Sequence, residues 1–368
     1  MRIGIDIKAL RNHKAGIGRY ITCLLNALQE QDLENEYVLF SPQEVAYEIK
    51  NSRWKKVVCQ GRIKLPGILW QQITLPLALK KENLDLFWGP EQTLFLRPIL
   101  GLKKVITIYD FVYKRYPQTM EKSVLWILNY FGTKSLLCSD QLVCISNFTA
   151  KEMNHFYPSI PLSKIGIVPC GFFTKEESYT PITREPFLLF VGSLEPRKNF
   201  VRLIKALEIL NKKGIDIPLY LTGPSGWKNQ DINQLLKSSP IQKNTTHLGY
   251  VSNEELKDLY QRCKALIFPS LYEGFGLPVL EALALKTPVL TSKDSVMEEI
   301  AGPCAIYFDS SSEKSIANTI ESFWFSKTLT TFTKEQEEAR IKILEKYTWE
   351  NAASAMLSQF SLSKRAES

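Results

Sequence analysis

The sequence predicts an α/β protein of two domains, each a doubly wound, Rossmann-like parallel sheet with helices on both faces. Three observations predict this architecture. Short apolar runs alternate with helical patterns along the chain. The alternation is interrupted by a polar, proline-containing stretch at 174–186 and then starts again. A chain of 368 residues is also too long for one ordinary hydrophobic core.

The first half contains seven short apolar runs that we interpret as strands. They are Arg2–Ile7, Tyr37–Ser41, Lys56–Gln60, Leu84–Gly89, Lys104–Asp110, Gln141–Ser146 and Ile165–Pro169. Between the first two, Tyr20, Leu24, Leu25 and Leu28 follow helical spacing, which predicts a helix over Arg19–Gln29.

The second half repeats the pattern. Its predicted strands are Pro186–Gly192, Pro218–Gly223, Thr246–Tyr250, Lys264–Pro269, Pro288–Thr291 and Ala305–Phe308. Its predicted helices are Val201–Lys212, Glu254–Arg262 and Leu277–Leu285, and the final segment Tyr347–Phe360 is again amphipathic. We therefore expect domains at 1–172 and 173–346, followed by a C-terminal helix within 347–368. Tandem domains of this kind bind ligands in the cleft between them, at the carboxyl ends of the strands.

Composition favours a soluble cytoplasmic protein. Apolar residues make up 45% of the chain and charged residues 23%. No apolar run reaches the ~18 residues of a membrane span, and the N-terminus reads as a strand and not as a signal peptide. The seven cysteines are scattered without a Cys-x-x-Cys pair, which argues for reduced thiols and against zinc.

The positive charge is concentrated in the first half. The chain carries +8 in total, whereas residues 1–175 hold 23 Lys and Arg against 14 Asp and Glu. Positions 49–81 contain eight basic residues and no acid, mixed with Trp54, Ile68, Leu69 and Trp70. One hypothesis is contact with an anionic membrane surface or a lipid diphosphate; the alternative is an ordinary solvated basic face. Nucleic acid is a poorer interpretation, because no nucleic-acid-binding motif is present.

Two loops at predicted strand ends suit phosphate. In Ala15-Gly-Ile-Gly-Arg19, Gly16 and Gly18 let backbone N–H groups approach a phosphate at a helix N-terminus, although a simple tight turn explains them equally well. In Gly192-Ser-Leu-Glu-Pro-Arg-Lys-Asn199, Arg197 and Lys198 stand at a helix entry, where positive charge opposes the helix dipole. The pair suits a diphosphate, and a solvated basic loop is the alternative.

A third loop carries two carboxylates eight positions apart, Glu273 and Glu281. We expect Glu273 in a loop and Glu281 in the first turn of a helix. The Glu281 carboxylate could accept hydrogen bonds from a ribose diol. The alternative is that its negative charge only stabilises the N-terminus of its own helix. Glu273 suits sugar hydroxyls together with the N–H groups of Phe275, Gly276 and Leu277.

These motifs resemble those of the retaining GT-B glycosyltransferases of family 4. Gly-Ser-Leu-Glu-Pro-Arg-Lys-Asn at 192–199 is similar to the family's donor-phosphate loop, and Glu-x7-Glu at 273–281 to its signature. The resemblance continues, in order along nearly the whole chain, at 15–20, 145–148, 168–171, 248–251, 268–270 and 347–349. The sequence of the loop at 192–199 is similar to that of family members that act in polysaccharide assembly, often mannosyltransferases.

The resemblance implies a role for each matching residue. Arg197 and Lys198 would neutralise the leaving nucleoside diphosphate beside Gly192 and Ser193. Glu281 would hold the ribose and Glu273 the transferred sugar. Gly16 and Gly18 would lie over the diphosphate from the first, acceptor-binding domain. The base would be bordered by Gly249, Tyr250 and Val251, and the C-terminal helix would return to the first domain.

The chain departs from the family pattern at two positions. Tyr109-Asp110 stands where many members have His-Asp at the acceptor-side strand end, so a histidine contact to the sugar is replaced by a tyrosine that can donate a hydrogen bond. Ser193 stands where many members have Arg, which leaves more of the phosphate neutralisation to Arg197.

We therefore expect a hexosyltransferase, with mannose favoured, that uses a nucleotide sugar such as GDP-mannose or a UDP-sugar as substrate and needs no cofactor. A nucleoside diphosphate leaves readily once its charge is stabilised, so no general acid is required. No Asp-x-Asp motif is present, which favours a metal-independent reaction. The acceptor would be a glycan or a lipid-linked glycan at the inner face of the plasma membrane. The alternatives are an inactive sugar-nucleotide-binding subunit and an epimerase or phosphorylase on the same fold.

Overall fold

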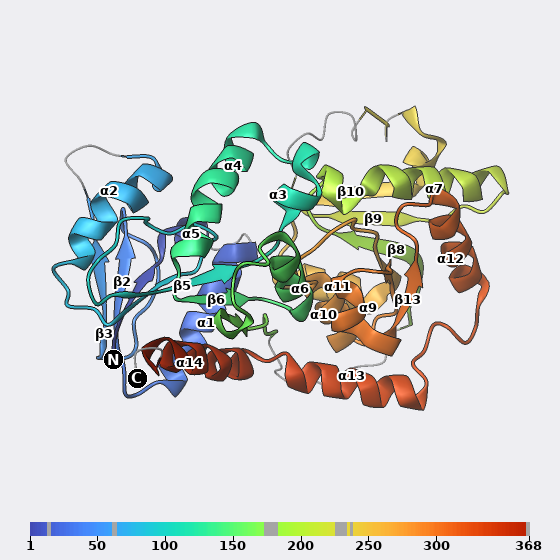
Figure 1. The fold of residues 1–368 in the computed structure, drawn as a ribbon. Helices are drawn as coiled ribbons and strands as arrows, with labels where there is room; N and C mark the ends of the chain where they lie inside the picture. Colours follow the sequence, from blue (N-terminus) through green and yellow to red (C-terminus); the bar gives the residue numbers. More distant parts are fainter. Residues whose placement is uncertain (13–15, 61–64, 173–182, 225–233, 236–237, 366–368) are drawn as a thin grey trace. The chain divides into compact units, whose positions relative to one another are not determined.

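The structure, a computed structural model, describes residues 1–12, 16–60, 65–172, 183–224, 234–235 and 238–365 (Figure 1). The chain divides into two compact units, Met1–Phe173 with Tyr347–Ser368, and Thr174–Lys346. Each unit is built on its own parallel sheet with helices packed on it. The prediction of two Rossmann-like, doubly wound domains is confirmed.

The sheet of the first unit has seven parallel strands in the order β3-β2-β1-β4-β5-β6-β7. Their bounds are β1 (Arg2–Asp6), β2 (Glu36–Ser41), β3 (Trp54–Val58), β4 (Leu86–Gly89), β5 (Lys103–Ile108), β6 (Gln141–Cys144) and β7 (Ile165–Ile167). The order reverses between β1 and β4, and the carboxyl ends at such a switch point are where open α/β sheets bind ligands. Strand β3 begins two residues before the predicted position, because Trp54 already stacks on Tyr37 of β2, with ring centroids 4.1 Å apart.

Helices cover both faces of this sheet (Figure 1). Helix α1 (Gly16–Gln31) lies on one face, where it packs against α14 (Trp349–Arg365). Helices α2 (Gly67–Leu79), α4 (Lys122–Ile127) and α5 (Thr133–Cys138) lie on the other. The remaining helical elements are η1 (Lys8–Asn12), α3 (Val112–Arg115), η2 (Pro117–Thr119), η3 (Leu128–Gly132), α6 (Asn147–Phe156) and η4 (Leu162–Lys164).

The C-terminal segment packs within the first unit. The Phe172 N–H donates to the Tyr347 carbonyl at 3.1 Å, and the Trp349 ring lies edge-on to Tyr20 of α1. The approach at Gly171 is so close that a Cβ there would stand 2.4 Å from the Trp349 nitrogen. The amphipathic pattern seen in the sequence becomes α14, whose Met356 and Phe360 are buried.

The sheet of the second unit has six parallel strands in the order β10-β9-β8-β11-β12-β13. Their bounds are β8 (Glu185–Val191), β9 (Leu219–Thr222), β10 (Thr245–Gly249), β11 (Cys263–Phe268), β12 (Val289–Ser292) and β13 (Ala305–Phe308). The helical elements are η5 (Pro196–Lys198), α7 (Phe200–Lys212), η6 (Pro240–Asn244), α9 (Asn253–Arg262), α10 (Leu277–Ala284), α11 (Val296–Ala301), η7 (Gly302–Cys304), α12 (Glu313–Phe325) and α13 (Lys334–Lys346). The switch point of this sheet lies between β8 and β11.

Helix α7 fixes the geometry of the loop that precedes it. Phe200, Leu203, Leu207 and Leu210 form its buried stripe, and Phe200 meets Phe190 of β8 edge-on at 5.3 Å. Each such side chain contributes about 1.5–3 kcal/mol on burial. The start of α7 is therefore held against β8, and the residues between them form a short, constrained loop.

Candidate functional site

Two loops meet at the switch point of the second sheet. One follows β8 and contains Arg197 and Lys198; the other follows β11 and contains Glu273. The Leu271 N–H donates to the Arg197 carbonyl at 2.9 Å, so the loops are joined through their backbones. The predicted donor-side residues, although far apart in sequence, therefore lie together.

The side chains of these loops form a compact ion cluster. Glu273 Oε2 lies 2.5 Å from Arg197 Nη1, and Glu273 Oε1 lies 2.6 Å from Lys198 Nζ. Lys198 is largely buried and also lies over the Phe268 ring, 5.0 Å from its centroid. The sequence predicted both cations for phosphate and Glu273 for the sugar, but it did not predict that the three residues contact one another.

The cluster keeps Glu273 ionised. Burial alone would raise the pKa of its carboxyl, but Arg197 and Lys198 outweigh that effect and lower the pKa to about 2. Burial also lowers the pKa of the Lys198 ammonium, although Glu273 opposes this shift. A carboxylate in such surroundings holds no proton at neutral pH, so Glu273 accepts hydrogen bonds and does not act as a general acid.

Glu195 belongs to the same cluster and was missed in the sequence. Its buried carboxylate accepts a hydrogen bond from Ser193 Oγ at 2.8 Å and lies 3.1 Å from Arg197 Nη2. The Arg197 guanidinium is thus held between Glu195 and Glu273, and both carboxylates orient it. The signal for Glu195 was its place two residues before Arg197, but side-chain orientation in a non-helical loop cannot be read from spacing.

Asn199 holds in place the loop that contains Arg197 and Lys198, which we call the cation loop (192–199). It adopts the left-handed conformation (φ 62°) between η5 and α7, and asparagine tolerates this conformation better than most residues. Its Nδ2 donates to the carbonyls of Pro269 (3.0 Å) and Ser310 (2.7 Å). The side chain of Asn199 therefore ties the cation loop to the end of β11.

Glu281 lies on α10, but not where it was expected. The helix begins at Leu277, so Glu281 is its fifth residue and lies past the first turn, and the prediction of a first-turn position is wrong. Its Oε2 accepts a hydrogen bond from Tyr260 Oη at 3.0 Å. Tyr260 is buried on α9 and was not predicted; nothing local in the sequence connects it with Glu281.

The N–H groups that were predicted to act together with Glu273 lie at the start of α10. Gly276 occupies the N-cap position and Leu277 is the first helical residue, while the side chain of Phe275 is buried. A Cβ at Gly276 would lie 2.9 Å from the Met297 sulfur, so another residue there would require the end of the Met297 side chain to shift.

Three glycines stand at neighbouring strand ends of the same sheet. Gly192, Gly223 and Gly249 follow or end β8, β9 and β10, and all have positive φ values of 149°, 136° and 70°. The Gly192 N–H donates to the Thr222 carbonyl at 2.9 Å, and the Gly223 N–H donates to the Gly249 carbonyl at 2.8 Å. These bonds fix one continuous backbone edge that only glycine can form without strain.

The predicted base-bordering residues continue this edge. Gly249 ends β10, and Tyr250 and Val251 follow it before α9 begins. Tyr250 is 62% exposed and lies at the surface. Within the described ranges, no group of three or more His, Cys, Asp or Glu side chains is arranged to hold a metal ion.

Two family sequence patterns match the chain. The family described as Glycosyltransferase Family 4 matches residues 15–176, and that described as Glycosyl transferases group 1 matches residues 172–339. Together they cover both units and include the cation loop and both glutamates. The chain belongs to the GT-B glycosyltransferases of family 4.

Relatives support the assignment at full length. The glycosyltransferase is 29% identical to the O-antigen chain mannosyltransferase B of Escherichia coli over 98% of its own chain and 100% of that protein. It is 33% identical over 241 residues to the serotype-specific mannosyltransferase WbdA of Escherichia coli, which is 60% of its own chain but 29% of WbdA. It shares its fold with a sucrose-phosphate synthase from Thermosynechococcus elongatus, with a TM-score of 0.75 and 18% identity over 100% of both chains.

In the first unit of the glycosyltransferase, the two predicted glycines lie inside α1. The helix begins at Gly16, so Gly16 and Gly18 belong to its first turn and not to a loop before it. First-turn N–H groups lack helical acceptors, which keeps this site suited to an anion. A Cβ at Gly16 would meet no atom within 4 Å, so close packing does not explain the glycine.

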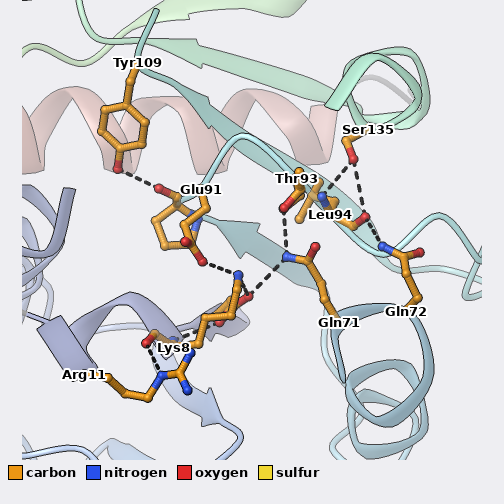
Figure 2. Close-up of polar contacts among 11 residues, drawn as sticks. Lys8, Arg11, Gln71, Gln72, Glu91, Thr93, Leu94, Tyr109 and Ser135 are labelled. Atoms are coloured by element: carbon orange, nitrogen blue, oxygen red, sulfur yellow. Dashed lines mark hydrogen bonds and ion pairs between the residues drawn. The ribbon is translucent and has the colours of Figure 1, made fainter. Parts of the chain in front are cut away.

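The predicted acceptor-side pair ends β5. The Tyr109 hydroxyl donates to the Pro90 carbonyl at 2.6 Å (Figure 2), and the Asp110 carbonyl accepts from Gln92 Nε2 at the same distance. Burial raises the pKa of Tyr109 well above its ordinary value, so the hydroxyl keeps its proton. Because the hydroxyl donates its proton to the Pro90 carbonyl, Tyr109 can only accept a hydrogen bond from another molecule. The sequence had suggested that it would act as a donor.

The basic segment 49–81 is only partly a surface. Trp54 and Trp70 are buried, and Trp70 donates its indole N–H to the Cys59 carbonyl at 3.0 Å, so neither ring is available to a partner. Arg62 and Lys64 lie outside the described residues. No helix in the described ranges combines the length and the apolar character needed to cross a bilayer.

Proposed function

We propose that the enzyme transfers a hexose, with mannose favoured, from a nucleotide sugar to a glycan or lipid-linked glycan during the assembly of a surface polysaccharide. The observation that carries this proposal is the cluster of Arg197, Lys198 and Glu273 at the switch point of the second sheet. The names of the relatives, O-antigen chain and serotype-specific mannosyltransferases, favour mannose and polysaccharide assembly.

The second unit would bind the donor. Arg197 and Lys198 would stabilise the charge of the leaving diphosphate, helped by backbone groups at Gly192 and Ser193. Glu281, oriented by Tyr260, would accept hydrogen bonds from the ribose diol. The base would lie along the strand edge at 249–251.

Donor binding would exchange one anion for another. Glu273 pairs with both cations, so an arriving diphosphate would take over these contacts. The Glu273 carboxylate would then turn to the hydroxyls of the transferred sugar, since it remains ionised. Glu273 would therefore become free to bind the sugar only when a diphosphate occupies the two cations.

The reaction that fits these groups needs no general acid, cofactor or divalent metal. The bond between the anomeric carbon and the diphosphate oxygen breaks, and the electron pair stays on the diphosphate. The acceptor hydroxyl attacks from the same face, so the configuration is retained, and a phosphate oxygen takes its proton. The candidate donors are GDP-mannose and a UDP-sugar.

A thermal-shift screen of nucleoside diphosphates and sugar nucleotides tests the donor class. We expect one base to stabilise the wild-type enzyme clearly and Arg197→Ala to remove the shift. Glu281→Ala and Arg197→Ala should also abolish donor hydrolysis and transfer, and full activity in both variants would falsify the assignment. An inactive binding subunit would show the shift without turnover, while an epimerase or phosphorylase would release an altered sugar nucleotide or a sugar phosphate.

We also infer a cytoplasmic enzyme that docks on the anionic inner face of the plasma membrane. Helix α2 carries Leu69, Ile73 and Leu77 four residues apart, and they are 41%, 52% and 57% exposed. The exposed Lys80 and Lys81 follow directly. An exposed apolar stripe beside lysines suits a surface of anionic lipid, where acyl chains receive the apolar side chains and headgroups pair with the ammonium groups.

A further inference from the structure

Both sheets carry a cation–glutamate pair at the switch point. In the second unit, Lys198 after β8 pairs with Glu273 after β11. In the first unit, Lys8 after β1 pairs with Glu91 after β4. The two strand pairs occupy equivalent places, because each is the neighbouring pair at which its sheet reverses order. The pair in the second unit belongs to the donor site; the pair in the first unit has been given no role so far.

The pair in the first unit is part of a fixed polar network (Figure 2). Lys8 Nζ lies 2.8 Å from Asp6 Oδ2, and the Lys8 N–H donates to Asp6 Oδ1 at 2.9 Å. Gln71 of α2 donates to Asp6 Oδ2 at 3.3 Å and to the Thr93 carbonyl at 2.8 Å. The network therefore joins β1, α2 and the loop after β4 at one point.

Exposure within the network increases toward Glu91. The side chain of Asp6 is 1% exposed and that of Lys8 is 10% exposed, whereas that of Glu91 is 27% exposed. Asp6 and Lys8 thus form a buried base. Glu91 is the most exposed member; its Oε2 is buried against Lys8, which leaves Oε1 for another molecule. Burial would lower the pKa of Lys8, but Asp6 and Glu91 outweigh it and raise the pKa above its ordinary value, so the support is permanently charged.

Stability alone does not account for this network. Removing charges from water costs several kcal/mol per ion, and well-packed apolar residues in their place are often equally stable. Glu91 also brings a negative charge to the carboxyl edge of the sheet. This charge matters for the ligand, because a diphosphate would be repelled by Glu91 while a hydroxyl group would donate to it.

Glu91 stands beside the predicted acceptor-side residues. Its neighbours Pro90 and Gln92 are the two partners of the Tyr109–Asp110 pair, through the 2.6 Å bonds described above. The loop that carries Glu91 is therefore clamped to the end of β5 on both sides. A carboxylate held this firmly can define the position of a bound hydroxyl group.

We propose that Glu91, positioned by Lys8, binds the acceptor of the glycosyltransferase by accepting hydrogen bonds from hydroxyl groups of its terminal sugar. This inference rests on the proposed function for the existence of a glycan acceptor. It adds the residue that recognises the acceptor, and it places the sugar end of a lipid-linked glycan at this edge, with the lipid diphosphate elsewhere. Lys8 is a positioning residue, since it acts through Glu91.

The test is Glu91→Gln, which keeps the shape of the side chain and removes its charge. Mannotriose and p-nitrophenyl α-mannoside serve as acceptor probes, with the donor identified in the thermal-shift screen. We expect the ratio of transfer to acceptor-independent donor hydrolysis to fall about 10- to 100-fold, the loss typical of one hydrogen bond to a charged group. The loss should appear mainly in the acceptor KM.

Glu82→Gln is the matched control. Glu82 lies before β4, at the opposite edge of the same sheet, and pairs with Arg2 at 2.9 Å and Lys55 at 2.6 Å. It should leave the ratio and the acceptor KM at wild-type values. The inference is overturned if Glu91→Gln behaves like Glu82→Gln, or if transfer and hydrolysis fall in parallel, which would mark Glu91 as structural. Wild-type enzyme that hydrolyses the donor but transfers to neither probe would contradict the acceptor class, whereas the absence of donor hydrolysis would contradict the proposed function itself.

Discussion

The Lys198 ammonium and the Glu273 carboxylate lie 2.6 Å apart. Lys198 and its neighbour Arg197 are the cations expected to receive a diphosphate, and Glu273 is the carboxylate expected to receive the sugar. The two halves of the proposed donor site thus contact each other. Under the proposed function, donor binding opens this contact, and Glu273 competes with the diphosphate for the two cations as well as binding the sugar.

The first prediction follows from this competition. Glu273→Gln should bind the nucleoside diphosphate product about tenfold more tightly, a gain of about 1.4 kcal/mol, because Lys198 loses its paired carboxylate and Arg197 keeps only Glu195. The same variant should transfer sugar much more slowly, since the carboxylate that holds the sugar is gone. Titration calorimetry with GDP and UDP, alongside a transfer assay, measures both effects. Weaker binding of both nucleotides would show that Glu273 supports the cations more than it competes for them.

The second prediction concerns acid stability. The pKa of Glu273 is lowered from 4.5 to about 2 in the folded state, so its ionised form stabilises the fold above about pH 5, and this contribution is lost as the pH falls toward 2. A shift of this size corresponds to about 3 kcal/mol. Urea denaturation at several pH values should therefore show the stability difference between wild type and Glu273→Gln shrinking from pH 5 to pH 2. A difference that stays constant over this range would rule out the linkage.

Much of the donor side could be predicted from the sequence, because its motifs stand directly after strands. Arg197, Lys198 and Glu273 follow β8 and β11, and parallel strands that are neighbours bring their carboxyl ends together. The pairing of the three side chains could not be predicted, since it depends on strand order and rotamers. Tyr260 was missed for the same reason: its contact with Glu281 joins two helices that no local pattern connects.

Two predictions for the first half were wrong for physical reasons: the loop at Gly16 and Gly18, and the availability of the Trp70 ring in the basic segment. Glycine is a poor helix former, so Gly16 and Gly18 predicted a loop, but the packing of α1 against α14 extends the helix over both. Helix α2 is apolar on nearly every side, so its pattern does not distinguish a buried from an exposed face. Only the structure shows that Trp70 points inward and Ile73 outward.

The third prediction tests the orientation of Glu281. Tyr260→Phe removes the hydroxyl that donates to Glu281 Oε2 and should weaken nucleotide binding about 2- to 10-fold, the effect of one ordinary hydrogen bond. Titration calorimetry with the nucleotide selected in the screen measures it. Tyr307→Phe is the control, because the Tyr307 hydroxyl donates to the Gly302 carbonyl in the same unit without contacting Glu281. Equal affinities in the two variants would remove Tyr260 from the binding site.

The fourth prediction separates the two contributions of Asn199. Asn199→Ala should destabilise the enzyme by about 2–4 kcal/mol, because it places alanine at a positive φ and leaves two carbonyls without the Nδ2 donor. Asn199→Gly loses the same hydrogen bonds but tolerates the backbone, so it should recover about 1 kcal/mol. Denaturant midpoints measure the series. Identical values for alanine and glycine would mean that backbone strain contributes nothing at this position.

The fifth prediction concerns the apolar stripe of α2. The double variant Ile73→Ser with Leu77→Ser should bind phosphatidylglycerol vesicles at least about tenfold more weakly than wild type, since each side chain loses about 1 kcal/mol or more of apolar burial. The control is Leu33→Ser with Leu162→Ser, which changes two leucines that are 68% and 67% exposed, in the loop after α1 and in η4 of the same unit. Vesicle sedimentation gives the partition coefficients, and neutral phosphatidylcholine vesicles isolate the contribution of charge. Equal binding to anionic and neutral vesicles would exclude the anionic surface, and an equal loss in both double variants would exclude α2 as its docking site.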